Sequence, residues 1–119
     1  MKRLILLFSA MLLCTTMLIS DNNKLSSKFV SDKTNANGTR VVDFKPEGVC
    51  AKLIHIEVSK SGIVENVAFT GGCSGNAQGI SALIKGMKKT EAIKRLKGIP
   101  CGKKASSCPD QLARALEAL

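Results

Sequence analysis

Alternating apolar and polar positions in the middle of the chain predict a pair of β-strands. In residues 51–58, Ile54, Ile56 and Val58 fall on one face of an extended chain, as in a strand with one buried side. Residues 63–70 alternate in the same way, and the Ser-Lys-Ser-Gly sequence between the two runs is typical of a turn. We therefore predict an antiparallel hairpin, preceded by a short edge strand at 40–44.

Three helices are predicted after the hairpin. The first spans 76–85 and ends at a glycine, and Thr90 is expected to cap the second, over 91–97. Pro109 suits the first position of the third helix, which makes Cys108 its N-cap. The residues expected to face the core from the first and last helices are Ile80, Leu83, Ile84, Leu112, Ala115, Leu116 and Leu119.

The order of the elements, strands first and helices afterwards, indicates the α+β fold class. We expect a small antiparallel sheet of two to three strands with the helices packed on one face. This domain is predicted over 39–119, after a polar linker at 21–38. About 80 residues bury only a modest core, so a staple such as a metal ion or a disulfide is expected.

Residues 1–20 resemble a signal peptide or a signal anchor. A basic start precedes an apolar run at 4–19, which is short for a bilayer span and lacks a good cleavage site. An uncleaved membrane anchor and a later translation start are alternative interpretations. The predicted localisation is a cytoplasmic domain, with or without this anchor, and export is a further alternative.

The formal net charge of +9 is unevenly distributed, and aromatic residues make up only 3% of the chain. The scarcity of aromatics removes the stacking platforms of single-strand binders, and no nucleic-acid motif is present, so no specific nucleic-acid partner is expected. A basic run opposed only by Glu91 predicts either an acidic protein partner or a solvated face. It comprises Lys85, Lys88, Lys89, Lys94, Arg95, Lys97, Lys103 and Lys104.

The predicted domain contains four cysteines, and their placement suggests one shared site. Cys50 directly precedes the first strand of the hairpin and Cys73 follows the second, so antiparallel pairing brings both to the same end of the sheet. Cys108 opens the last helix, where the free N–H groups favour a thiolate, and Cys101 lies in the preceding loop. Their spacing contains no C-x-x-C pair and matches no common zinc finger.

Three other polar or thiol residues have simpler interpretations. His55, the only histidine, is expected to be an ordinary sheet residue rather than a metal ligand. Asp110 is interpreted as an acid that stabilises the helix dipole, with a role in the surroundings of Cys108 as the alternative. Cys14, in the apolar N-terminal run, is expected to carry no chemistry.

Three motifs give the chain a specific family resemblance. The sequences GCSGNAQGIS at 72–81, LKGIPCGK at 96–103 and SCPDQLA at 107–113 resemble the TSCPD domain, named for its Thr-Ser-Cys-Pro-Asp motif. Ser106 takes the Thr position here, and the resemblance covers 48–119. The family occurs as small stand-alone proteins and at the C-terminus of vitamin B12-dependent ribonucleotide reductases. The resemblance thus implies ribonucleotide reductase as a partner.

A more distant resemblance is to U-type iron–sulfur scaffold proteins, which carry three cluster cysteines. By position these correspond to Cys50, Cys73 and Cys108, and Cys101 would be a fourth ligand. The acidic residue that follows the first cysteine in those scaffolds is absent, because Ala51 and Lys52 follow Cys50. The resemblance therefore implies a metal or cluster pocket rather than cluster transfer.

The sequence leaves three functional hypotheses. In the first, Cys50, Cys73, Cys101 and Cys108 bind zinc or an iron–sulfur cluster, as a set of soft thiolate ligands would. In the second, the Cys101–Cys108 pair serves ribonucleotide reduction as a thiol-redox accessory in deoxynucleotide synthesis. In the third, disulfides staple a structural domain after export. No complete enzyme active site is evident, and the chain is too short to hold a reductase catalytic barrel.

Overall fold

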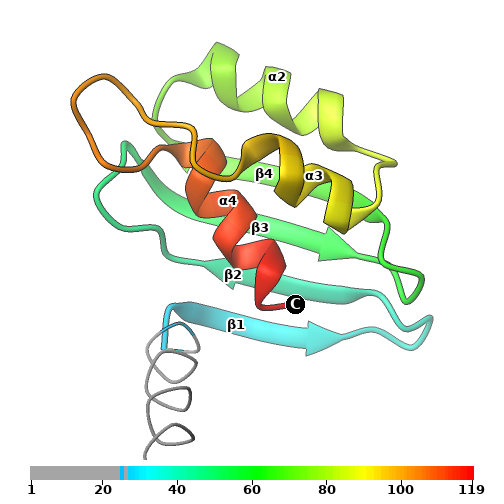
Figure 1. Cartoon of the computed structure of the whole chain (residues 1–119). Coiled ribbons are helices and arrows are strands. Elements are labelled where there is room, and N and C mark those ends of the chain that lie inside the picture. The colour runs from blue at the N-terminus through cyan, green and yellow to red at the C-terminus, as the bar shows by residue number, and fades with distance from the viewer. Residues whose placement is uncertain (1–24, 26) are drawn as a thin grey trace, which may run out of the picture.

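The structure, a computed structural model, describes residue 25 and residues 27–119 (Figure 1). Four strands form one antiparallel sheet in sequence order, and the three helices that follow cover one of its faces. The α+β architecture is therefore confirmed. In chain order the elements are β1 (Phe29–Thr34), β2 (Arg40–Phe44), β3 (Ala51–Val58), β4 (Val64–Gly71), α2 (Ser74–Ile84), α3 (Lys89–Leu96) and α4 (Cys108–Glu117).

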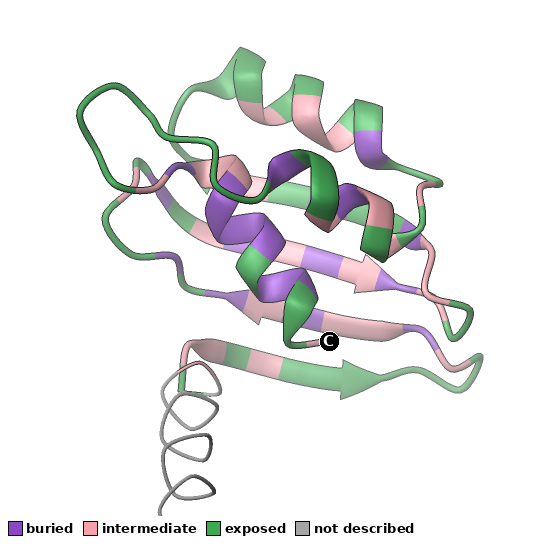
Figure 2. Ribbon diagram, in the orientation of Figure 1, coloured by how far each residue is buried: buried purple, intermediate pink, exposed green. Residues whose placement is uncertain are grey.

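The core lies between the two central strands and the helices, and alternation in the sequence creates it. The inward residues of β2 and β3 are fully or almost fully buried, whereas their neighbours in sequence are partly exposed. Figure 2 shows the buried residues concentrated in α4 and in the strands beneath it. The largest buried apolar side chains are Val42, Phe44, Ile54, Ile56, Val64, Leu112 and Leu116.

A β-bulge interrupts the alternation predicted for the second strand of the hairpin. Glu57 pairs with Asn66, but the next residue, Val58, pairs with Val64, which leaves Glu65 as an extra residue. Val64 and Val67 are therefore both buried although they are three residues apart. The strict period of two predicted over 63–70 is wrong at this point.

The sheet has one strand more than predicted, because β1 lies inside the segment interpreted as a polar linker. Phe29 packs its ring against Phe44, with the ring centroids 5.3 Å apart. Arg40 on β2 donates two hydrogen bonds to the Asp32 carboxylate across the strand pair. The strand is otherwise largely exposed, so its sequence carries no clear alternation.

Among residues 25 and 27–119, the structure contains no helix that is long and apolar enough to span a membrane. The signal-like segment predicted at 1–20, with its apolar run at 4–19, lies outside the described residues.

Two predicted helix details are wrong. The stripe of α2 was expected to comprise Ile80, Leu83 and Ile84; Ile84 is buried and Ile80 packs against the core, but Leu83 is 79% exposed. Thr90 does not cap α3, because the helix begins at Lys89, two residues earlier than predicted, and its N-cap is Lys88.

Candidate functional site

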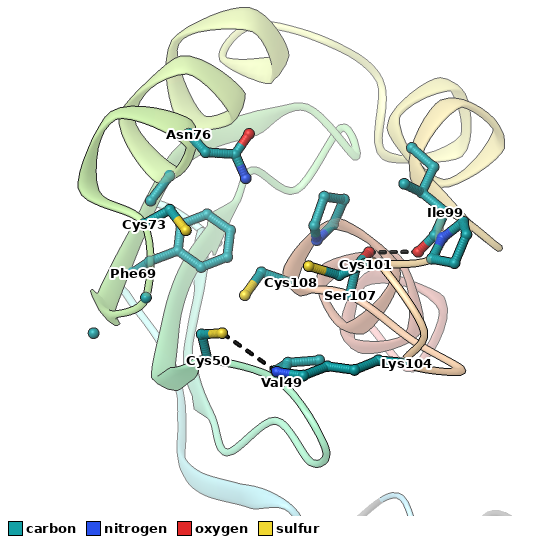
Figure 3. A pocket seen from close by; sticks show the side chains of 15 residues that line it. Val49, Cys50, Phe69, Cys73, Asn76, Ile99, Cys101, Lys104, Ser107 and Cys108 are labelled. Carbon is teal, nitrogen blue, oxygen red and sulfur yellow. Dashed lines mark hydrogen bonds between the residues drawn. The ribbon is translucent and has the colours of Figure 1, made fainter.

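The four cysteines of the domain line one cavity of about 180 Å³, at the end of the sheet where β3 begins and β4 ends. Figure 3 shows their side chains arranged around this space, although they come from four separate segments of the chain. Cys50, Cys73 and Cys101 are exposed and Cys108 is partly buried. Apolar residues form much of the remaining wall, namely Val49, Phe69, Ile99, Pro100 and Pro109.

Strand register and two glycines place Cys73 beside Cys50. Ala51 pairs with Gly71, so the residues flanking this pair meet at the sheet end. Gly71 and Gly72 have φ of +78° and +83°, a conformation that glycine adopts without strain. A Cβ at Gly72 would lie 3.4 Å from the Ala51 nitrogen. The double glycine therefore lets the chain turn tightly against the Cys50 segment before α2 begins.

Ser107, not Cys108, is the N-cap of α4. Its hydroxyl oxygen accepts a hydrogen bond from the Asp110 N–H at 3.2 Å and donates one to the Ile99 carbonyl at 2.5 Å. Cys108 is consequently the first residue of the helix and Pro109 the second, one position later than predicted. Cys108 nevertheless lies in the first turn of α4, as the sequence predicts.

The Asp110 carboxylate ties the Cys101 loop to this helix. It is only 2% exposed and accepts hydrogen bonds from the Ser106 hydroxyl at 2.6 Å, the Gly98 N–H at 2.8 Å and Arg114 Nε at 3.0 Å. Burial alone would raise the pKa of Asp110, but these donors and the Arg114 charge outweigh it and lower the pKa. The interpretation of Asp110 as an acid acting on the helix dipole missed this role, since Gly98 lies 12 residues earlier, on the other side of the Cys101 loop.

Gln111 extends the same network to the segment before Cys50. Its buried side chain donates from Nε2 to the Ser106 hydroxyl at 2.9 Å and accepts the Glu47 N–H at 3.2 Å. The sequence analysis did not single out this residue. Gln111 precedes the buried Leu112 in the same helix, and a buried amide normally has hydrogen-bond partners, but the sequence does not show that Gln111 is buried.

A tight turn brings Lys104 to the cavity. The Lys104 N–H donates to the Cys101 carbonyl at 3.0 Å, and Gly102 between them has a φ of +57°. The side chain of Lys104 then reaches across the cavity mouth, with Nζ 3.4 Å from Cys50 Sγ (Figure 3). The turn that carries Cys101 is thereby linked to the segment that carries Cys50.

The four sulfur atoms line the same cavity, but they are too far apart to coordinate one metal ion together. All four cysteines are free thiols. In the part of the chain that the structure describes, no three His, Cys, Asp or Glu side chains are close enough together to hold a metal ion. A single ion would therefore require movement of the exposed segments, whereas a cluster has several iron atoms and can take ligands that lie further apart.

His55 lies away from this cavity, on the sheet face opposite the helices. Its Nδ1 is 2.8 Å from the Asp43 carboxylate, and Nε2 is 3.3 Å from that of Glu57. The hydrogen bond with Asp43 is the main cause of the raised pKa of His55, and Glu57 adds to it against the opposing effect of burial. Its chemistry is that of a cross-strand ion pair.

The basic run is spread over α3, its flanks and the Cys101 loop. Lys88, Lys94, Lys103 and Lys104 are exposed. Two other cations are held in exposed ion pairs, Arg95 with Glu91 at 2.7 Å and Lys97 with Glu117 at 2.5 Å. Lys104 is the residue of the run that lines the cysteine cavity.

Fold and site together define a small α+β domain with a cysteine-lined cavity built around a Ser-Ser-Cys-Pro-Asp motif. Residues 26–119 match the family model of the TSCPD domain, and the chain belongs to this family. The family resemblance noted in the sequence is thus confirmed. No curated protein and no solved structure matches the chain significantly, and the resemblance to U-type scaffolds stays a prediction.

Proposed function

We propose that this protein is a metal–thiolate module in which Cys50, Cys73, Cys101 and Cys108 bind an iron–sulfur cluster or a zinc ion. The observation that carries the proposal is the convergence of four cysteines, from four separate segments, on one cavity of about 180 Å³. Three of the four are exposed and none belongs to the hydrophobic core, so core packing does not account for their placement around one cavity.

The chemistry of the cavity wall supports a soft metal centre. The residues lining it include neither a carboxylate nor a histidine. A set of ligands made only of thiolates favours zinc, copper(I) and iron–sulfur clusters over hard cations such as magnesium or calcium. The spread of the sulfurs favours a cluster, because the four ligands of a zinc ion lie at about 2.3 Å from a single centre.

The fold can adapt to such a centre at three of its four ligands. Cys73 precedes a helix that is mostly exposed over its first turns, Cys101 lies on an exposed turn, and Cys50 is exposed at the end of the bend before β3. Cys108 is instead fixed by the hydrogen bonds of Ser107 and Asp110. We therefore infer that Cys108 is the rigid ligand against which the other segments close.

Anaerobic purification of the full chain tests the proposal. Metal, acid-labile sulfide and titratable thiols are measured on the same sample. A bound metal, with thiols that become reactive only after its removal, is the expected result. Each of the four cavity cysteines changed to Ser should lower the metal content at least several-fold, whereas the matched control Cys14→Ser should not. A metal-free protein with freely reactive thiols, unchanged by reconstitution with iron and sulfide or with zinc, would contradict the proposal.

A thiol-redox role is the second candidate, since Cys101 and Cys108 are free and line the same cavity. It would suit an accessory that re-reduces a partner such as ribonucleotide reductase, as the family resemblance implies. This role predicts a reversible Cys101–Cys108 disulfide in metal-free protein, which the same thiol titration detects.

A further inference from the structure

The two edge strands of the sheet, β1 and β4, differ in how well they are protected against pairing with a further strand. The β1 edge carries Asp32 and Lys33 and has a break in register at its start, all of which oppose strand addition. The β4 edge has neither a charged residue nor a proline over residues 66–71. Its beginning is covered, because Val64 exchanges hydrogen bonds with the turn after α2. In the part of the chain that the structure describes, no segment pairs with 66–71 on the side away from β3.

A groove of about 540 Å³ runs along this free edge, between β4 and one flank of α2. Figure 1 shows α2 beside β4, at the end of the helical layer. The helix lines the groove with Ser74, Ala77, Gln78 and Ser81, which are all uncharged and mostly small. Helix α2 therefore lies next to the edge without covering it, and the strand stays accessible.

The whole surface is free of charge. Residues 66–84, which include the free edge and α2, contain no Asp, Glu, Lys or Arg, although the formal net charge of the chain is +9. Most of these residues are exposed (Figure 2). Copies of so basic a chain repel one another least where no charged side chain lies between them. An acidic partner would instead be drawn to the lysines of α3 and of the Cys101 loop. The distribution of charge thus favours a second copy of this chain as the occupant.

We propose that the free edge of β4 and the adjacent flank of α2 form the interface of a symmetric homodimer. Two identical strands can pair antiparallel about a twofold axis, because each then makes the same hydrogen bonds to the other. Residues 66–71 of one protomer pair with the same residues of its partner. The two four-stranded sheets join into one continuous sheet, with the helices of both protomers on the same face.

The same axis brings the two α2 helices side by side. Helix α2 runs antiparallel to β4, since it begins just after the strand ends and the residues after its last turn hydrogen-bond to Val64. An axis through the middle of the free edge therefore passes near Gln78, which is central among the helix residues that line the groove. The short side chains of Ser74, Ala77 and Ser81 let the two helices approach closely.

This interface is separate from the proposed function. None of the four cavity cysteines lines the groove. Dimer formation and metal binding can therefore be tested independently of each other.

Sedimentation velocity of the full chain over a range of concentrations tests the dimer. Reductant and a chelator are present, so that neither a disulfide nor a metal ion can bridge two copies. A reversible monomer–dimer equilibrium is expected. Gln78→Lys places two like charges at the axis and should raise the dimer Kd at least about tenfold. Gln78→Glu should do the same although it lowers the net charge of the chain, and mixing the two variants should restore the dimer, because opposite charges then meet.

Leu83→Lys is the matched control. It adds the same charge to an exposed residue of the same helix, outside the groove, and should leave the dimer Kd unchanged. Far-UV circular dichroism checks that each variant keeps the fold.

Three results would overturn the proposal. A wild-type chain that stays monomeric at every concentration would leave the β4 edge to a strand of another protein. Association that neither Gln78 variant weakens would assign it to another surface, such as residues 1–24. Folded Gln78 variants that remain monomeric when mixed would show that the two α2 helices do not meet at this residue. Metal content is measured on separate samples without chelator, so a failure here is distinct from a failure of metal binding.

Discussion

The carboxylate of Asp110 accepts a hydrogen bond from the backbone N–H of Gly98 at 2.8 Å, across the whole segment that carries Cys101. The same carboxylate accepts the hydroxyl of Ser106, near the other end of that segment, at 2.6 Å. The last residue of the Ser-Ser-Cys-Pro-Asp motif therefore closes the loop that forms one wall of the cavity. In this domain the motif builds the cavity as well as supplying one of its cysteines.

Removing the Asp110 carboxylate should destabilise the fold. Asp110→Ala leaves the Gly98 N–H and the Ser106 hydroxyl without their acceptor, and we expect the free energy of unfolding to fall by about 2–4 kcal/mol. Urea unfolding followed by far-UV circular dichroism measures this. Glu117→Ala, which removes the exposed ion pair with Lys97, is the control and should cost less than about 1 kcal/mol. Equal losses in the two variants would refute the role of the Asp110 network.

Truncation should affect the two leucines of the predicted helix stripes to very different extents. Leu112 is fully buried and Leu83 is 79% exposed. Leu112→Ala is expected to lower the free energy of unfolding by about 2–5 kcal/mol through lost burial and a cavity. Leu83→Ala should stay within about 0.5 kcal/mol of the wild type, as surface changes usually do. A comparable loss at Leu83 would mean that α2 packs differently from the structure described here.

A side chain at the second glycine of the turn before Cys73 should destabilise the fold. Gly72 has a φ of +83°, so Gly72→Ala is expected to cost about 1–2 kcal/mol and to shift Cys73 away from Cys50. Gly79→Ala is the matched control, because its Cβ would meet nothing within 4 Å inside a helix. It should stabilise by about 0.5–1 kcal/mol. Thermal unfolding separates the two, and zinc or iron loading should drop in Gly72→Ala alone.

The His55 pair should make stability depend on pH. Its folded-state pKa lies above the unfolded value of about 6.5, so the protonated imidazole stabilises the native state. This contribution is complete below the unfolded pKa and is lost as the pH rises through the folded pKa. We expect the free energy of unfolding to decline from about pH 6 towards pH 8, and less steeply in His55→Gln. Urea unfolding at both pH values, with reductant present, measures the difference. Identical declines in both proteins would assign the effect to other groups.

The hairpin and the last helix were predicted well from the sequence. Each buries one face, so its apolar residues recur at the period of a strand or of a helix. Ile54, Ile56 and Val58 are inward as expected, and so are Leu112 and Leu116. Strand β1 was missed, since an exposed edge strand has no buried face to impose alternation. The bulge at Glu65 was also missed. One extra residue shifts the pairing of β4 with β3 but leaves the composition of the strand unchanged.

The cavity was predictable only in part. Strand pairing and the helix start placed Cys50, Cys73 and Cys108 at one end of the sheet, and the structure brings Cys101 to the same cavity. The groups that hold these residues in place were not predictable. Asp110 reaches Gly98 and Gln111 reaches Glu47 through contacts between distant segments, which no local pattern encodes. For the same reason the contact between Lys104 and Cys50 emerges only from the fold.

X-ray absorption at the metal edge of anaerobically purified full chain tests the central claim most directly. It reports which atoms surround the bound metal and at what distance. We predict a first shell made of sulfur alone, at about 2.3 Å, for zinc or for the iron atoms of a cluster. In the Cys108→Ser variant the metal should be lost or the sulfur shell reduced, and in Cys14→Ser the spectrum should not change. A stoichiometrically loaded wild-type protein whose first shell is mainly nitrogen or oxygen would contradict the account.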